Sequence, residues 1–183
     1  RWNQYVKLNG EFAGDGFGHS VSLYAPAGIP KLVIGAPNND EFEPNAGQIY
    51  IYELQSLEWV LVNNFIAPDA NQNDQFGNAV SIYLNLIVVG ADGNDDNGSF
   101  SGSAYIYKRH SVSQNWEYMT KILADDAAAG DRFGASVSAG SNSRVLIGAY
   151  SDDNGANQNV GSAYVFDELN GVWSVTFKLE AAD

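Results

Sequence analysis

The four tryptophans of this chain are evenly spaced along its 183 residues. Trp2, Trp59, Trp116 and Trp173 each follow the previous tryptophan by 57 residues. Equal periods of roughly this size are typical of solenoids, propellers and arrays, in which each repeat is one supersecondary unit. The spacing therefore predicts that one structural unit occurs three times.

Each repeat contains the same succession of short motifs. A loop with an acidic residue leads to Phe-Gly, an apolar segment follows, and a second apolar run ends in Gly-Ala. A loop rich in Asn, Asp and Gly then leads to an aromatic segment and to the next tryptophan. Val, Ile, Tyr and Phe fill the runs and turn-forming residues separate them, which predicts four short strands per repeat. The Phe-Gly pairs are Phe17-Gly18, Phe76-Gly77 and Phe133-Gly134.

The third predicted strand of each repeat is apolar on both faces. Side chains alternate along a strand, so one face carries the aromatic residues and the other carries Ala, Ile or Val. A strand of this kind is expected to be covered on both sides. A four-stranded sheet between two neighbouring sheets is what a propeller blade requires. The aromatic pairs are Tyr50/Tyr52, Tyr105/Tyr107 and Tyr164/Phe166.

These motifs resemble the FG-GAP repeat. Phe-Gly precedes a strand, a second strand ends in Gly-Ala-Pro (intact at 35–37), and Gly-x-x-Tyr follows. That repeat builds the seven-bladed propeller of integrin α subunits and occurs in many bacterial secreted proteins. The sequences of segments 94–107 and 151–166 resemble the bacterial repeats more closely. The resemblance implies a propeller that works outside the cell, in adhesion or protein interaction.

One feature of the integrin repeat is missing from this chain. Integrin-type repeats carry a calcium loop of Asp-x-Asp-x-Asp-Gly type between their first and second strands. The corresponding segments here are 24–31, 83–85 and 139–144, and none contains an acidic residue. The integrin calcium site is therefore not expected in this chain.

The count of strands predicts an incomplete propeller. We expect an all-β fold with three four-stranded antiparallel blades at 16–66, 67–123 and 124–183, preceded by an orphan fourth-strand copy and lead-in at 1–15. Closed propellers have about four to eight blades, so three blades leave open ends. We expect the orphan strand to pair with a neighbouring subunit or with a missing part of a longer chain. The alternative is that it adds to an edge of its own three-blade body or crosses the open gap to close it. Its predicted interface residues are Trp2, Tyr5, Val6 and Leu8.

The net charge of −13 narrows the class of partner. Phosphate contacts need clustered Lys and Arg, so nucleic acid is not an expected partner. Membrane insertion is not expected either, because no apolar run is long enough to span a bilayer. Sixteen of the 22 acidic residues lie in two recurrent connections: Glu11, Asp15, Asp69, Asp74, Asp125, Asp126, Asp131 and Asp183 before Phe-Gly, and Asp40, Glu41, Glu43, Asp92, Asp95, Asp96, Asp152 and Asp153 after Gly-Ala. Equivalent loops emerge on the same edge of a propeller, which predicts an acidic rim.

The second connection of the middle repeat is the candidate metal site. Asp92, Asn94 and Asp96 follow the D-x-N-x-D rhythm that arranges oxygen ligands around calcium. The alternative is that these residues form tight turns through side-chain to backbone hydrogen bonds, and this alternative is favoured. Ser103 stands where an EF-hand has its glutamate, so the loop is not an EF-hand.

Catalysis is not expected. His19 and His110 lie at non-equivalent positions in different repeats, and neither has an identifiable nucleophile as a partner. Three functions remain open: an adhesion or protein-interaction module, a structural protomer that assembles with copies of itself into a ring or filament, and a glycan-binding propeller. The repeated tryptophans suggest the last, although packing between blades is the favoured role for them.

Overall fold

The structure, a computed structural model that describes residues 6–25, 28–155 and 157–180, is all-β as predicted. It holds three four-stranded antiparallel sheets, each a simple meander, with no helix among the residues described. Blade 1 consists of β1 (Ser20–Tyr24), β2 (Lys31–Ala36), β3 (Gln48–Gln55) and β4 (Glu58–Phe65). Blade 2 consists of β5 (Ala79–Tyr83), β6 (Leu86–Ala91), β7 (Ser103–Arg109) and β8 (Trp116–Ile122). Blade 3 consists of β9 (Phe133–Gly140), β10 (Arg144–Ala149), β11 (Ser162–Leu169) and β12 (Val172–Glu180).

The three blades repeat one another in detail. In each, the pairing of the third strand with the fourth shifts by one residue halfway along, which makes a β-bulge and increases the local twist. The shifts fall between Ile51 and Tyr52, between Ile106 and Tyr107, and between Val165 and Phe166. Equivalent residues therefore adopt equivalent positions across the chain.

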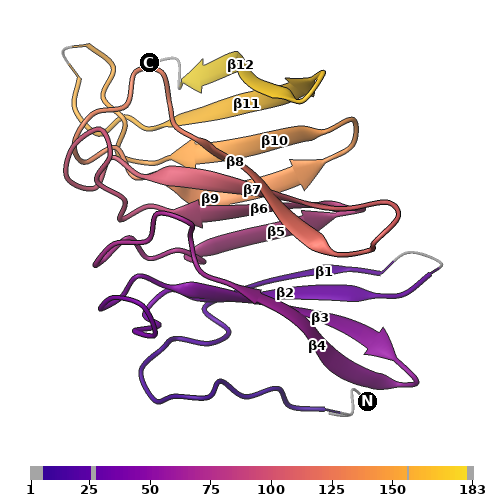
Figure 1. The fold of residues 1–183 in the computed structure, drawn as a ribbon. Helices are drawn as coiled ribbons and strands as arrows, with labels where there is room; N and C mark the ends of the chain where they lie inside the picture. Colours follow the sequence, from indigo (N-terminus) through magenta and orange to yellow (C-terminus); the bar gives the residue numbers. More distant parts are fainter. Residues whose placement is uncertain (1–5, 26–27, 156, 181–183) are drawn as a thin grey trace, which may run out of the picture.

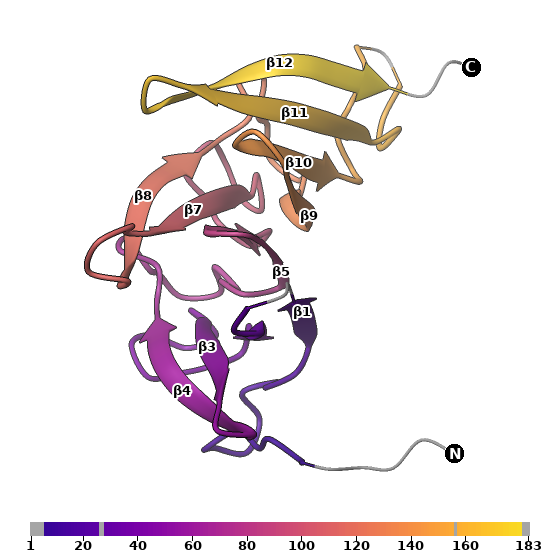
Figure 2. The same cartoon turned by 90° about the vertical axis from the view of Figure 1, so that its right-hand side faces the viewer.

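The blades are stacked side by side and do not close on themselves (Figure 1). In Figure 2 the first strands β1, β5 and β9 are gathered together, while the outer strands β4, β8 and β12 diverge. The first strands of blades 1 and 2 are joined by a hydrogen bond, in which the Ile82 N–H donates to Ser22 Oγ at 3.1 Å. The result is an open arc of propeller blades.

The core lies between the blades. One cluster joins blades 1 and 2 and contains Ile51, Phe76 and Tyr107, and a second joins blades 2 and 3 and contains Ile106 and Phe133. The middle blade is covered on both faces, because Ile106 and Tyr107 point in opposite directions and are 0% and 1% exposed. This confirms the expectation drawn from the doubly apolar third strand.

The tryptophans of the three blades occupy equivalent places, as predicted. Each lies near the start of a fourth strand, with Trp59 opposite Leu54 and Trp116 opposite Arg109. Trp116 is buried against blade 1, whereas Trp173 is half-buried against blade 2. The two therefore pack between blades.

The predicted orphan strand lies mostly outside the described residues. Trp2 and Tyr5 belong to that part, so their predicted interface role stays a prediction. Val6 and Leu8 are described, but they lie in no strand, and Val6 is exposed. Among the described residues there is no helix long and apolar enough to cross a membrane.

Candidate functional site

One edge of all three sheets carries the acidic connections. Because the strands alternate in direction, the loop after the second strand and the connection before the next Phe-Gly emerge on the same side of each blade. In Figure 1 these segments lie on the left, away from the β3–β4 hairpin. The sequence feature and the topology together form an acidic rim.

Some acids of the rim are buried and support its turns. Asp74 accepts the Asn71 N–H at 2.8 Å. Asp131 accepts the Ala128 N–H at 2.6 Å. Burial raises the pKa of both carboxyls, and the backbone hydrogen bonds only partly offset it. These residues hold the loop before Phe-Gly in shape and are not free to bind a partner.

Asp15, Asp92 and Asp152 are buried as well, and the other described acids of the rim are exposed. They are Glu11, Asp40, Glu41, Glu43, Asp69, Asp95, Asp96, Asp125, Asp126 and Asp153. Their density along one edge produces a negative potential that extends about 8 to 10 Å at physiological salt. The sequence alone did not separate these solvated acids from the buried ones.

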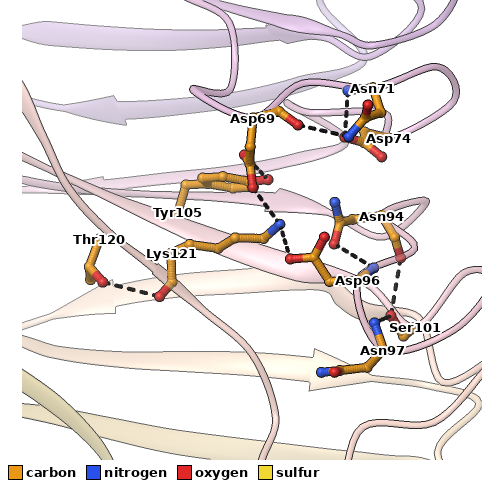
Figure 3. A network of polar contacts seen from close by, with 10 residues as sticks. All are labelled: Asp69, Asn71, Asp74, Asn94, Asp96, Asn97, Ser101, Tyr105, Thr120 and Lys121. Atoms are coloured by element: carbon orange, nitrogen blue, oxygen red, sulfur yellow. Dashed lines mark hydrogen bonds and ion pairs between the residues drawn. The ribbon is translucent and has the colours of Figure 1, made fainter.

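A polar network fastens the connection between blades 1 and 2 to blade 2 (Figure 3). Asp69 accepts the Tyr105 hydroxyl at 2.9 Å and lies 2.8 Å from Lys121 Nζ, which is also 2.6 Å from Asp96. Burial opposes the ionisation of Asp69, but the Lys121 ammonium and the Tyr105 hydroxyl outweigh it and lower its pKa. We call this arrangement of tyrosine, aspartate and lysine the blade lock.

The blade lock recurs in blade 3 and is absent from blade 1. Asp126 accepts the Tyr164 hydroxyl at 2.9 Å and lies 2.7 Å from Lys178 Nζ. Blade 1 keeps the tyrosine but has Gly10 and Asn64 at the aspartate and lysine positions. Sequence reasoning missed this network, although its aspartates and its lysines are spaced by the same 57 residues as the tryptophans.

Blade 3 differs from the other blades at one buried position of the rim. Asn39 of blade 1 donates to Asp15 at 2.7 Å. Asn94 holds the equivalent position in blade 2, where its amide partly offsets the rise that burial causes in the pKa of Asp74. Asp152 stands at this position in blade 3, where Lys178 neutralises it at 2.8 Å. The lysine of the blade lock therefore also makes this substitution possible.

The structure gives the predicted calcium ligands separate partners. Asp92 faces Arg132 at 3.5 Å, Asn94 Oδ1 accepts the Asp96 N–H at 3.3 Å, and Asp96 is paired with Lys121. Within the described part of the chain, no group of three or more acidic, His or Cys residues is placed to hold a metal ion. This arrangement does not form a calcium shell unless both cations move away, and the site stays a prediction.

The two histidines have separate surroundings. His19 is exposed just before β1. His110 lies in the β7–β8 turn, where its Nδ1 accepts the backbone N–H groups of Val112 and Ser113 at 3.3 and 3.2 Å. Each histidine therefore belongs to its own turn or loop.

A groove of about 590 Å³ lies between the outer strands of blades 2 and 3. It is lined by Thr120, Asp125 and Trp173 among others, and Lys108 Nζ lies 5.5 Å from the centre of the Trp173 ring. It combines an aromatic ring with a carboxylate and a hydroxyl.

The sequence model of one family, described as the FG-GAP repeat, matches residues 59–107 and 116–166, together more than half of the chain. Each match begins at a fourth-strand tryptophan and ends in the third strand of the following blade, so the sequence repeat crosses the contact between two blades. A comparison with curated proteins found no significant match.

Proposed function

Because this chain belongs to the FG-GAP repeat family, we propose that it is a non-catalytic protein-interaction module that works outside the cell, in adhesion or protein binding. Its three blades serve within a larger chain or assembly. The observation that carries the proposal is the acidic rim, where ten exposed carboxylates, three of them paired with a lysine, lie along one edge of the sheets. Binding residues are commonly found on loops held by such a scaffold.

The chemistry of the rim defines the kind of partner. Solvated carboxylates attract a surface rich in Lys and Arg, and such pairs contribute more to the rate of association and to specificity than to affinity. Binding should therefore weaken as salt is raised, because the Debye length shortens. A partner of this class is a basic extracellular protein.

The proposal is tested on arrays of purified extracellular proteins and of glycans. The rim variant Glu43→Gln/Asp125→Asn removes two solvated charges from the rim, and Glu58→Gln/Glu117→Gln removes two from the outer strands β4 and β8 as a matched control. We expect a protein that binds the wild type and the control but binds the rim variant several-fold more weakly. Absence of any protein partner, or equal loss in both variants, would refute the proposal.

Glycan binding is a second candidate, favoured by the groove beside Trp173. Sugars stack on aromatic rings, and Asp125 and Thr120 supply hydrogen-bond partners at the same groove. On the same arrays, binding of a glycan that is lost in Trp173→Ala but kept in the single rim variant Glu43→Gln, which lies outside the groove, supports this candidate. If Trp173→Ala leaves glycan binding unchanged, the groove is not the site.

A further inference from the structure

We propose that the open face of blade 3 binds the Phe17-Gly18 loop of a second copy of this chain, so that copies join head to tail. The new contact repeats the joint that already links blade 1 to blade 2 and blade 2 to blade 3. The proposal rests on the larger assembly inferred above and names one partner in it.

Three backbone hydrogen bonds define each internal joint. At the first joint, N–H groups of the loop before Phe76 and of Phe76 itself donate to the β2–β3 loop: Asn73 to Pro44 at 2.9 Å, Gln75 to Asn45 at 3.0 Å and Phe76 to Ala46 at 2.9 Å. At the second joint the same bonds recur: Gly130 to Ser99 at 2.9 Å, Arg132 to Phe100 at 3.1 Å and Phe133 to Ser101 at 3.0 Å. The joint is therefore a fixed pattern of donors and acceptors.

The acceptor half of a third joint is already formed in blade 3. Asn159 has the positive φ of 55° that its counterparts Asn45 and Phe100 have at 53° and 57°. Its neighbour Gly161 has a φ of 77°, in the same region as Gly47. The carbonyls of residues 158–160 thus belong to a loop with the conformation of a bound joint, and no described residue donates to them.

The donor half is formed at the start of blade 1. Gly14 and Gly16 have φ values of 104° and 73°, and their counterparts in blade 3, Gly130 and Arg132, have 98° and 61°. The N–H groups of Gly14, Gly16 and Phe17 have no partner among the described residues. Backbone donors without a protein partner favour pairing with another chain.

The glycine of the Gly-Ala motif is a further feature that blade 3 shares with the internal joints. A Cβ on Gly35 would lie 2.0 Å from the Gly77 carbonyl oxygen, and Gly90 stands in the same relation to Gly134. Gly148 is the third member of the series. It lines an open groove of about 540 Å³ together with Ser136, Gly161 and Leu179. The equivalent surface of blade 1 is filled by Phe76-Gly77 of the next blade, so the groove has the place and the surroundings of a Phe-Gly site.

The apolar faces at the two ends are counterparts of buried faces. On the first strand, Val80 and Ile82 are 8% and 5% exposed where blade 1 covers them, whereas Leu23, which is equivalent to Ile82, is 59% exposed. On the opposite side, Val88 is buried by blade 3, whereas the equivalent Leu146 is 40% exposed. The outer face of blade 1 and the outer face of blade 3 are therefore exposed copies of the two faces that pack against each other at the internal joints.

Charge at the new joint is compatible with a second copy. Each internal joint carries an ion pair at the same two positions, with the acidic and basic residues exchanged between the joints. The pairs are Glu53 with Arg109 at 2.7 Å and Lys108 with Glu168 at 3.0 Å. At the third joint the corresponding residues are Asp167, which its own Arg144 neutralises at 2.7 Å, and the uncharged Leu54 of the second copy. At these two positions no like charges meet. Two copies supply six blades, which lies within the range of closed propellers.

The test measures the mass of the full chain by sedimentation velocity over a concentration series. We expect reversible species of two copies if the ring closes, or longer ones if the rotation does not close. Leu23→Glu blocks the face of blade 1, and Leu179→Glu blocks the face of blade 3, where Leu179 is 53% exposed. Each variant alone should be monomeric. Val112→Glu, at a residue 84% exposed in the β7–β8 turn, is the matched control and should assemble like the wild type.

Mixing the two blocked variants gives the decisive result. Each lacks one half of the joint and keeps the other, so an equimolar mixture should form a one-to-one dimer although neither variant associates alone. A monomeric wild type at about 100 μM, which is a hundred-fold above a micromolar Kd, overturns the proposal, and so does assembly that neither variant changes. The rim variant Glu43→Gln/Asp125→Asn should assemble normally, which separates this proposal from the one on partner binding.

Discussion

Gly35 and Gly77 belong to different blades, yet a methyl group on Gly35 would lie 2.0 Å from the Gly77 carbonyl oxygen. The Gly-Ala end of the second strand in one blade therefore lies against the Phe-Gly segment of the next, with no space for a side chain. In the same way, a methyl group on Gly90 would lie 1.9 Å from the Gly134 carbonyl oxygen. These two sequence motifs thus form the two halves of one joint.

Alanine at either Gly-Ala glycine should therefore separate the blades. We expect Gly35→Ala and Gly90→Ala to lower the free energy of unfolding by about 1 to 3 kcal/mol, because the obstructing atom is a backbone oxygen that cannot rotate away. Gly140→Ala is the control, since its Cβ would meet only the Arg144 carbonyl at 3.5 Å. Urea titration measures all three. Equal stability of Gly35→Ala and Gly140→Ala would contradict the close contact.

The ion pair between Glu53 and Arg109 crosses the first joint with little exposure to water. The two side chains are 5% and 14% exposed and their charged atoms lie 2.7 Å apart. We expect Arg109→Met to lower the free energy of unfolding by about 3 kcal/mol, because it leaves a buried carboxylate without its guanidinium. The double variant Glu53→Met/Arg109→Met should cost clearly less than the sum of the two single changes.

The exposed pair of Arg144 with Asp167 is the control for this cycle. Its arginine side chain is 57% exposed, so Arg144→Met should lower the free energy of unfolding far less than Arg109→Met does. If the Glu53 and Arg109 variants prove additive in chemical denaturation, the pair contributes no coupling across the joint.

The sequence predicted the blades well because the signals that determine them are local. The alternation of Tyr105, Ile106 and Tyr107 predicted a strand covered on both faces, and the even spacing of the tryptophans predicted equivalent positions in all blades. Turn residues around Phe-Gly and Gly-Ala marked where strands end. None of these inferences needed to know which blade contacts which.

The sequence predicted the candidate site less well because its features depend on distant contacts. A carboxylate that accepts a backbone N–H, such as Asp131, has the same identity as a solvated one, such as Asp125. The blade lock joins Asp69 to Lys121 across 52 residues, and only the fold brings them together. The separation of Asp92 and Asp96 onto Arg132 and Lys121 likewise arises from tertiary contacts.

Stability should depend on pH through two aspartates with opposite signs. The Lys178 ammonium and the Tyr164 hydroxyl outweigh burial and lower the pKa of Asp126 in the folded state. Its contribution is complete above the unfolded pKa of about 4 and is lost as pH falls through the folded value. Asp126→Asn should therefore flatten the loss of unfolding free energy in acid.

Asp131 should act in the opposite direction. Burial, with the nearby Asp152, Asp153 and Asp126, raises its pKa, so the folded state binds the proton more tightly than the unfolded chain. Its contribution grows as pH falls through the folded value and levels off below about 4. Asp131→Asn should remove that gain. Urea titrations between about pH 3 and 7 compare the variants, and profiles that shift in the same direction would contradict the assignment.

Calcium binding to the loop that contains Asp92, Asn94 and Asp96 should be weakened by two basic side chains that already pair with its carboxylates. Arg132 faces Asp92 and Lys121 is paired with Asp96, so a calcium ion must displace both before these oxygens can converge. We expect Lys121→Met/Arg132→Met to bind calcium more tightly than the wild type in calorimetric titration at low salt, because both carboxylates are then released. Adding Asn94→Ala to that variant should weaken binding again, since it removes the third oxygen ligand. Far-UV circular dichroism must show the same strand content in all three proteins. Absence of calcium-dependent heat in the double variant would mean that the loop acts only as a turn.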